Sequence, residues 1–375
     1  MRDPRPAPAI TPIARGGWLD ALRIVVALLI VLHHFRSAAP IPLDQIHPVF
    51  DRGYLLTNFF IIDSGYVLGR IYDRRLIDGR TSLGLYYRHR FLRVVPAHLV
   101  VMIAFAALVL ATAAFGILPS NPYWFDWSAY PAQFFLVQAY GVPGGHGWNA
   151  PTWTLSALLG CYLLLPALLR LAHRLPPAGL LVGAVALALA ANAATHTLLG
   201  YPVYRMPLGF GFVRALPLFI LGVALAGFAA QVPVRPSLGA ALGIVSVLAL
   251  VALQARGDFA LLSLGLICAI IFAAGAMPVE RPVRLVETLA LASFSIFLTN
   301  EFVRIVWFAA LDAAGQSQWP ATVRWVAWGA GPGAAVLAAL AFRILFDRPS
   351  QAWLNARLTS GAPGRRLPRN PPPAL

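Results

Sequence analysis

The chain has 375 residues, 59% of them hydrophobic and 11% charged, and its mean hydropathy is +0.71. Soluble domains carry about 25% charged residues, so this composition excludes a soluble protein and indicates one that crosses a membrane several times. The 29 basic side chains are all arginine and give a net charge of +15, as expected where loop arginines fix membrane topology. We therefore expect no nucleic-acid partner. Cys161 and Cys268 lie within apolar runs and are expected to be buried thiols rather than a disulfide.

The first apolar run, Trp18–Phe35, is long enough to cross a bilayer, yet it contains Asp20, Arg23, His33 and His34. An ionisable group in hydrocarbon costs about 2.5–3.5 kcal/mol on insertion scales, so such groups usually face a protein interior. Arg23 and His34 lie eleven positions apart, which puts them within about 20° on one helical face and about 16 Å apart along the axis. Asp20 joins that face, whereas His33 points about 100° away. These charges also disfavour a cleaved signal peptide, whose apolar region is shorter and uninterrupted.

The remaining apolar runs predict a single membrane domain at 17–347, between disordered cytoplasmic tails at 1–16 and 348–375. We expect about ten helical spans, each near the ~20 residues that a bilayer needs. They are predicted at 17–36, 53–71, 95–117, 151–171, 178–199, 208–230, 237–254, 259–278, 286–311 and 322–346. Within the Trp- and Tyr-rich stretch 119–150, Phe134–Tyr140 is too short to span and is expected to be interfacial or re-entrant.

The distribution of arginine predicts the topology. If the N-terminus is cytoplasmic, most arginines fall in inside loops, above all in 72–93. The fold class we expect is therefore an all-α polytopic protein of the cell inner membrane, with both termini cytoplasmic. This orientation places Arg23 near the cytoplasm and His34 toward the outside.

Four short motifs follow one another between residues 17 and 170, and a fifth stretch lies later in the chain. They are Arg23 followed by ten residues and His34; Asn58-Phe-Phe-Ile-Ile-Asp-Ser-Gly-Tyr-Val-Leu68; His89-Arg-Phe-Leu-Arg-Val-Val-Pro-Ala-His-Leu99; Asn149-Ala-Pro-Thr-Trp-Thr-Leu-Ser156 with Tyr162 and Pro166; and Ser293-Phe-Ser-Ile-Phe-Leu-Thr-Asn300. Together they resemble the membrane-bound acyltransferase-3 family, which acylates hydroxyls on surface glycans and other secreted acceptors. The second motif is close to the family's Asp-Phe-Phe-Phe-x-Leu-Ser-Gly-Phe helix, and the third matches Arg-x-x-Arg-x-x-Pro.

The chain departs from the family pattern at four positions. Leu158 stands where the family often has Glu, Asn58 where it has Asp, and Asn300 where it has a late His. Asp63 replaces an apolar residue. The family roles of those positions are not carried over to this chain.

The resemblance implies a membrane-bound O-acyltransferase. It would move an acetyl or similar small acyl group from cytoplasmic acyl-CoA to a hydroxyl of a glycan or glycolipid at the outer face. Its partners would be acetyl-CoA or another acyl-CoA as co-substrate, a glycan or lipid-linked sugar as acceptor, and the lipid bilayer. We expect no permanently bound cofactor and no metal.

His34 is the predicted general base, because imidazole titrates near neutral pH. It would deprotonate the acceptor hydroxyl or, alternatively, take the acyl group as a nucleophile; the competing interpretation is a hydrogen-bonded core histidine. Arg23 is predicted either to orient the donor or to pair structurally with Asp20 or Asp63.

Arg90 and Arg93 are three residues apart and would share one helical face. Arginine pairs bind phosphates bidentately, so these two are predicted to hold the acyl-CoA, with a role in topology alone as the alternative.

Three further residues are predicted to contact substrate. Ser64 either does so or, with Gly65, permits close helix packing. Trp153 either stacks on the acceptor or anchors the helix at the membrane interface, and Ser156 lies beside it. The possible supporting residues are Asp63, Asp20, His98 and Glu301.

Two other classes of function stay open at this point. A polytopic exporter would also carry intramembrane charges, but it commonly shows repeated halves, and the polar motifs here cluster in the first half. A haem protein would need His34 and His98 on facing helices. A non-catalytic acyltransferase-like protein is a third interpretation, suggested by Leu158 and Asn300.

Overall fold

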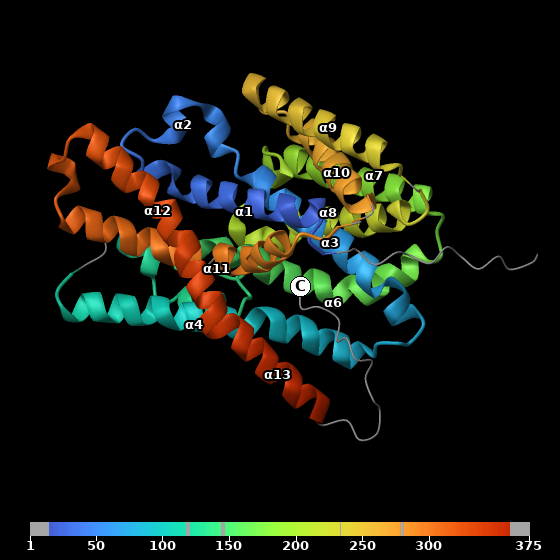
Figure 1. The fold of residues 1–375 in the computed structure, drawn as a ribbon, viewed down its shortest axis with the longest axis horizontal. Coiled ribbons are helices and arrows are strands. Elements are labelled where there is room, and N and C mark those ends of the chain that lie inside the picture. The colour runs from blue at the N-terminus through green and yellow to red at the C-terminus, as the bar shows by residue number, and fades with distance from the viewer. Residues whose placement is uncertain are drawn as a thin grey trace, which may run out of the picture.

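The computed structural model describes residues 15–117, 121–143, 147–232, 234–277, 279 and 281–360, and those residues form helices and connections without a strand. Long helices follow the order of the predicted spans, as Figure 1 shows. They are α1 (Trp18–Phe35), α3 (Tyr54–Ile77), α4 (Leu83–Ala114), α6 (Trp153–Ala172), α7 (Pro177–Leu199), α8 (Gly211–Ala229), α9 (Pro236–Arg256), α10 (Ala260–Ala276), α11 (Arg284–Ala313) and α12 (Ala321–Phe342). The shorter α-helices are α2 (Leu43–Ile46), α5 (Tyr130–Phe134) and α13 (Arg348–Ser360).

Eight helices in the described part of the chain are long and apolar enough to cross a membrane. The other two of the long set are α3, which carries several polar residues, and α10, which has 17 residues. The prediction of an all-α polytopic membrane protein is therefore confirmed. The count of ten spans and the cytoplasmic termini remain predictions.

Helices α3 and α8 approach each other closely through glycine. A Cβ on Gly65 would lie 2.2 Å from the carbonyl oxygen of Phe219, and one on Gly222 would lie 2.1 Å from that of Ile62. Small residues let backbones approach in a lipid environment, where packing rather than water exclusion drives helix association. This close contact confirms the packing role predicted for Gly65, and it fixes the neighbouring Ser64.

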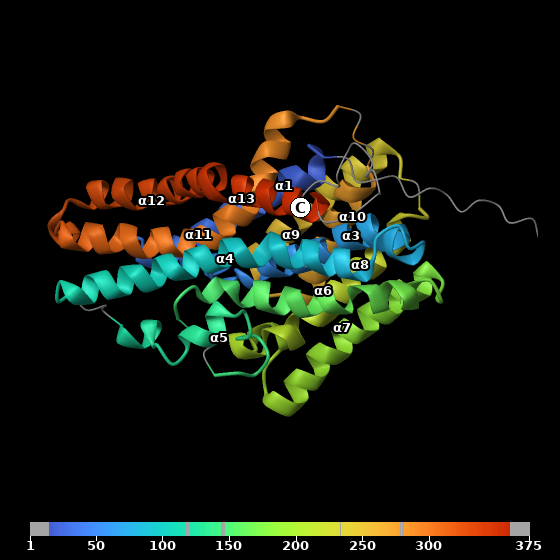
Figure 2. The ribbon, with the colours of Figure 1, turned by 90° about the horizontal axis from the view of Figure 1, so that it is seen from below.

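Helix α1 packs against α11 and α12. Ala27, Val31 and Phe35 of α1 form a buried cluster with Ile296 of α11 and Ala335 of α12, among others. Figure 2 shows α12 and α11 along one side of the molecule and α7 along the other. Helices α7 and α9 have few buried residues, as expected for helices that face lipid.

Helix α4 begins earlier than predicted. Its N-cap is Ser82, whose Oγ accepts a hydrogen bond from the backbone N–H of Leu85, 3.2 Å away. Two turns or more of arginine-bearing helix therefore precede the apolar run that we expected to start at residue 95. Arg90 and Arg93 lie on this helix and not in a loop.

The ends of the chain and the loop 119–150 also differ in detail from the sequence prediction. Residues 348–360, within the predicted disordered tail, form α13, which crosses α4 in Figure 1 and is tied to it by a 2.7 Å hydrogen bond from Gln351 to the Leu92 carbonyl. Residues 1–14 and 361–375 of the predicted tails lie outside the described residues. Phe134–Tyr140 forms the end of α5 and a series of turns, and it does not span.

Candidate active site

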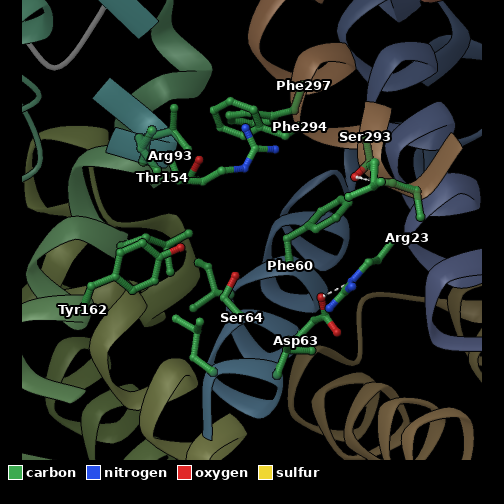
Figure 3. Close-up of a pocket in the computed structure, with 18 of the residues that line it drawn as sticks. Arg23, Phe60, Asp63, Ser64, Arg93, Thr154, Tyr162, Ser293, Phe294 and Phe297 are labelled. Atoms are coloured by element: carbon green, nitrogen blue, oxygen red, sulfur yellow. Dashed lines mark hydrogen bonds and ion pairs between the residues drawn. The ribbon is translucent and has the colours of Figure 1, made fainter. Parts of the chain in front are cut away.

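A cavity of about 180 Å³ lies between α1, α3, α4, α6 and α11 (Figure 3). Six predicted site residues line it: Asp20, Arg23, Asp63, Ser64, Arg90 and Arg93. Most of the remaining wall is apolar and includes Ile30, Phe60, Leu155, Leu158, Phe294 and Phe297. Charged groups from three separate sequence motifs therefore meet in one mainly apolar chamber, as small-molecule sites commonly require.

Arg23 binds both of its predicted partners. Its Nη1 lies 3.0 Å from the carboxylate of Asp20, one turn earlier, and its Nε lies 2.7 Å from the carboxylate of Asp63 on α3. Asp20 also accepts a 2.8 Å hydrogen bond from the backbone N–H of Gly16. All three side chains are largely buried, so each charge depends on the others for compensation. The predicted Asp–Arg pairing is thus present at the cavity wall.

Arg93 projects into the cavity beside an aromatic wall. Its guanidinium carbon lies 4.4 Å from the centre of the Phe294 ring, and Figure 3 shows it directed toward Phe294 and Phe297. Its Nη1 lies 3.1 Å from a carboxylate oxygen of Asp347, which also pairs with Arg343 at 3.4 Å. One buried carboxylate therefore serves two arginines, which leaves excess positive charge at this end of the cavity.

Arg90, one turn earlier on α4, has no acidic partner among the described residues. Its Nη2 donates a 3.1 Å hydrogen bond to the Tyr72 hydroxyl, and its guanidinium lies 5.2 Å from the Tyr72 ring centre. The Nε of Arg90 is buried without a hydrogen-bond partner. This guanidinium therefore retains donors for an anionic ligand.

The middle of the cavity carries hydroxyl groups. Ser64 of α3 lies across from Thr154 and Tyr162 of α6, and Ser293 of α11 completes the set (Figure 3). Leu158, at the position of the family glutamate, also lines the cavity. The only lining carboxylates among the described residues are therefore those of Asp20 and Asp63.

His34 lies on the same face of α1 as Arg23 but beyond the cavity. The last α1 residue that lines the cavity is Ile30, one turn before His34. The Nδ1 of His34 lies 2.5 Å from the Oδ1 of Asn300 on α11. The structure thus places the predicted base one turn past one end of the chamber and the predicted donor-binding arginines in its wall.

The hydrogen bonds of Asn300 determine the tautomer of His34. The Asn300 Nδ2 donates to the backbone carbonyls of Ile296 and Phe297, at 3.0 and 2.6 Å. Carbonyl oxygens only accept, so the amide nitrogen must lie on that side and the Oδ1 must face His34. The imidazole therefore carries its hydrogen on Nδ1, and its Nε2 holds the free lone pair. Among the described residues no hydrogen bond occupies that Nε2.

Glu301 follows Asn300 and forms an ion pair with Arg304. The two side chains are 2.5 Å apart, and the Arg304 guanidinium lies 5.7 Å from the ring centre of Trp124. Glu301 does not line the cavity, but it is near enough to His34 to act on it electrostatically.

The other predicted site residues lie outside the cavity. Trp153 is 5% exposed, with Gly211 against its ring and the Arg214 guanidinium 4.9 Å from its ring centre. Ser156 is fully buried; its hydroxyl donates to the Leu136 carbonyl at 2.7 Å and accepts from the Ala139 N–H at 3.2 Å. In this structure it therefore holds the 134–140 segment against α6.

His98 is likewise fully buried, and its Nε2 is 2.9 Å from the carbonyl oxygen of Gln133. It ties α4 to the end of α5, whereas His34 is bonded to α11. Cys161 and Cys268 are free thiols, as predicted, but only Cys161 is fully buried, whereas Cys268 is partly buried.

Sequence reasoning did not assign Asp347, Tyr72 or Tyr162 to the site. Asp347 is an acidic residue at the end of the last apolar run, between Arg343 and Arg348, and an intramembrane carboxylate of this kind signals a buried partner. Tyr72 had no comparable signal, because its role depends on where α3 meets α4. Tyr162 lay within the recognised fourth motif.

Comparisons with known proteins identify the family of the chain. The profile of the family described as Acyltransferase domain, acyltransferase-3, matches residues 17–344. The chain is 27% identical over 162 residues to the acyltransferase MdmB of Streptomyces mycarofaciens, a match that covers 42% of this chain and 39% of that relative. No solved structure shows a significant match. The family profile spans the membrane domain from α1 to the end of α12, and the chain therefore belongs to the acyltransferase-3 family.

Proposed function

We propose that the protein is a membrane O-acyltransferase of the inner membrane. It moves an acetyl or similar small acyl group from cytoplasmic acyl-CoA to a hydroxyl of a glycan or glycolipid at the outer face. One observation carries the proposal: α1 presents Arg23 in the wall of a mainly apolar cavity and His34 one turn beyond its other end. A donor entering from the arginine end thus points its acyl group toward the histidine.

Arg90 and Arg93 bind the phosphates of the donor in this proposal. Coenzyme A is polyanionic, and arginine recognises phosphate oxygens through paired N–H donors. Arg90 supports this role because its guanidinium has only a tyrosine hydroxyl as its polar partner within the described residues. The arginine-rich start of α4 also fits the cytoplasmic side by the rule that positive residues stay inside.

His34 acts as the general base through Nε2. The acceptor hydroxyl oxygen attacks the thioester carbonyl carbon while its proton passes to Nε2. The tetrahedral intermediate then collapses: the C–S bond breaks, the thiolate of coenzyme A leaves, and His34 returns the proton to it. The hydrogen bond from Nδ1 to Asn300 keeps the lone pair on Nε2 throughout the neutral state.

A direct test is transfer of label from acetyl-CoA in membranes that contain the protein and a candidate glycan. We expect His34→Ala to lower the transfer rate by about 10²–10⁴-fold, the usual contribution of a general base. His33→Gln is the matched control, because the neighbouring histidine bonds the Phe50 carbonyl at 2.9 Å and does not line the cavity.

Full activity of His34→Ala would show that His34 is not the general base. Label that stays on the protein when the acceptor is omitted, and that is lost in His34→Ala, would instead identify His34 as a nucleophile. Absence of transfer with every acyl-CoA and acceptor would favour the non-catalytic alternative.

A further inference from the structure

A second cavity, of about 30 Å³, lies between α3, α7, α8 and α10. None of its lining residues lines the larger cavity. Its polar lining groups are Asn58 of α3, Asn192 of α7, Arg214 of α8 and Tyr204 of the loop before α8. Asn192 already accepts a 3.3 Å hydrogen bond from the Val203 N–H, and Tyr204 donates to Asp258 at 3.1 Å.

Arg214 is a buried cation without a counter-ion among the described residues. It is 6% exposed, and within the described residues it takes part in no ion pair and no hydrogen bond. The face of the Trp153 ring lies 4.9 Å from the guanidinium carbon, and Tyr54 is near enough to act on Arg214 electrostatically, but neither side chain is a carboxylate. Arginine stays protonated in proteins, so burial cannot neutralise it as it would a lysine or histidine.

The acidic residue that contacts the lining of this cavity, Asp258, already has other hydrogen-bond partners. Asp258 binds the hydroxyls of Tyr54 and Tyr204, whose rings stack 4.2 Å apart. Within the described residues it forms no ion pair or hydrogen bond with Arg214, and the carboxylates of the large cavity pair with Arg23. A ligand in the small cavity is therefore needed to balance the charge of Arg214.

Asn58 adds neutral donors to the same space. It is 6% exposed, its Oδ1 is buried without a hydrogen-bond partner, and no described residue forms a hydrogen bond with its Nδ2. Its carboxamide can present two N–H groups. A permanent cation and an amide without partners thus line one enclosed volume, and buried polar groups of this kind call for a bound partner.

We propose that this cavity binds a small monoanion of the size of chloride or of a single carboxylate group. Its volume of about 30 Å³ exceeds the ~10–15 Å³ that one water molecule needs by the same measure, which leaves room for one such ion. The guanidinium of Arg214 supplies the charge, and the Asn58 amide donates a hydrogen bond. The bound anion neutralises the cation under Trp153 and so stabilises the junction of α3, α6 and α8. This inference does not rest on the acyl-transfer reaction.

The test measures the melting temperature of the purified full-length protein as each anion is added at constant ionic strength, with methanesulfonate as the bulky replacement. We expect chloride and formate to raise Tm, by about 2 °C at tenfold excess over Kd. Glucuronate and glucose distinguish the source: a rise with glucuronate but not glucose assigns the site to a carboxylate carried on a sugar. A rise with chloride and formate alone assigns it to a free ion.

Three variants make the test specific. Asn58→Asp places a carboxylate beside Arg214, so we expect a higher Tm without added anion and no response to chloride or formate. Arg214→Met loses the response. Arg205→Met keeps it, because Arg205 also lies over a tyrosine ring, at 6.0 Å, but is exposed.

The proposal is overturned if the wild-type Tm responds to chloride and formate no more than that of Arg214→Met. A lower Tm in Asn58→Asp than in the wild type, under anion-free conditions, overturns it as well. The second comparison does not require the Arg214 variant to fold.

Discussion

At the end of α1 that we predict to be cytoplasmic, Arg23 is held by two carboxylates, whereas at the other end His34 is held by one neutral amide. Arg23 contacts Asp20 at 3.0 Å and Asp63 at 2.7 Å. His34 contacts Asn300 at 2.5 Å through Nδ1, and its Nε2 has no partner within the described chain. Both ends lie on one face of the same helix.

In the proposed mechanism, this difference separates a group that keeps its charge, Arg23, from one that exchanges a proton, His34. A guanidinium between two carboxylates is locked in place and in charge state, which suits orientation of a donor. An imidazole with one nitrogen fixed and the other open suits proton transfer. On the proposed mechanism, the same helix supplies a rigid charged end and the end that carries out proton transfer.

Removal of Arg23 gives the largest expected effect on stability. Arg23→Met leaves Asp20 and Asp63 buried without their partner, and breaking a buried pair in this way costs about 3–5 kcal/mol of unfolding free energy. Chemical unfolding in mixed micelles measures the change. Arg80→Met is the control, since the Arg80–Asp78 pair at 3.3 Å is on the surface and contributes about 1 kcal/mol or less. Equal effects of the two substitutions would contradict the ion-pair network.

At the other end, Asn300→Ala tests how His34 is held. We expect kcat to fall about tenfold to a hundredfold, because Nδ1 loses its acceptor and the tautomer is no longer fixed. The KM for acyl-CoA should stay near the wild-type value. Thr299→Val is the neighbouring control, as Thr299 bonds only the Ser295 carbonyl of its own helix. An unchanged kcat and pH profile in Asn300→Ala would show that Asn300 does not position His34.

A smaller effect is expected from Arg90→Gln. The KM for acyl-CoA should rise about tenfold through the loss of charge-assisted hydrogen bonds to phosphate, with little change in kcat or Tm. Steady-state kinetics against acyl-CoA concentration measure it. Arg88→Gln provides the comparison, because Arg88 is exposed on the same helix and does not line the cavity. If both variants bind acyl-CoA as the wild type does, the donor site lies elsewhere.

Much of the arrangement around α1 could be predicted from the sequence. Hydropathy located every long helix, because backbone groups in lipid must bond within a helix and apolar runs of this length reveal it. Helical geometry put Arg23 and His34 on one face, and the cost of burying charge predicted that Arg23 would bind Asp20 or Asp63. The cavity contacts of Arg90, Arg93 and Ser64 agree with the recognised motifs.

What the sequence did not reveal depends on contacts between distant helices. The pairing of Arg93 with Asp347 joins residues 254 positions apart, and that of His34 with Asn300 joins residues 266 apart. Trp153 was predicted either to stack on the acceptor or to anchor the helix at the membrane interface, but its environment depends on α8, whose Gly211 and Arg214 lie against its ring. The early start of α4 also escaped prediction, because hydropathy marks the apolar part of a helix and not a polar extension that begins at a serine cap.

In the proposed mechanism, donor and acceptor reach opposite ends of α1 from opposite sides of the membrane. Proteoliposomes in which a C-terminal tag reports the orientation test it, with labelled acetyl-CoA outside and the acceptor glycan sealed inside. For molecules whose arginine-rich α4 end faces outward, we predict that label appears on the enclosed glycan, and that His34→Ala abolishes it while His33→Gln does not. Transfer that occurs only when donor and acceptor are on the same side would contradict the account.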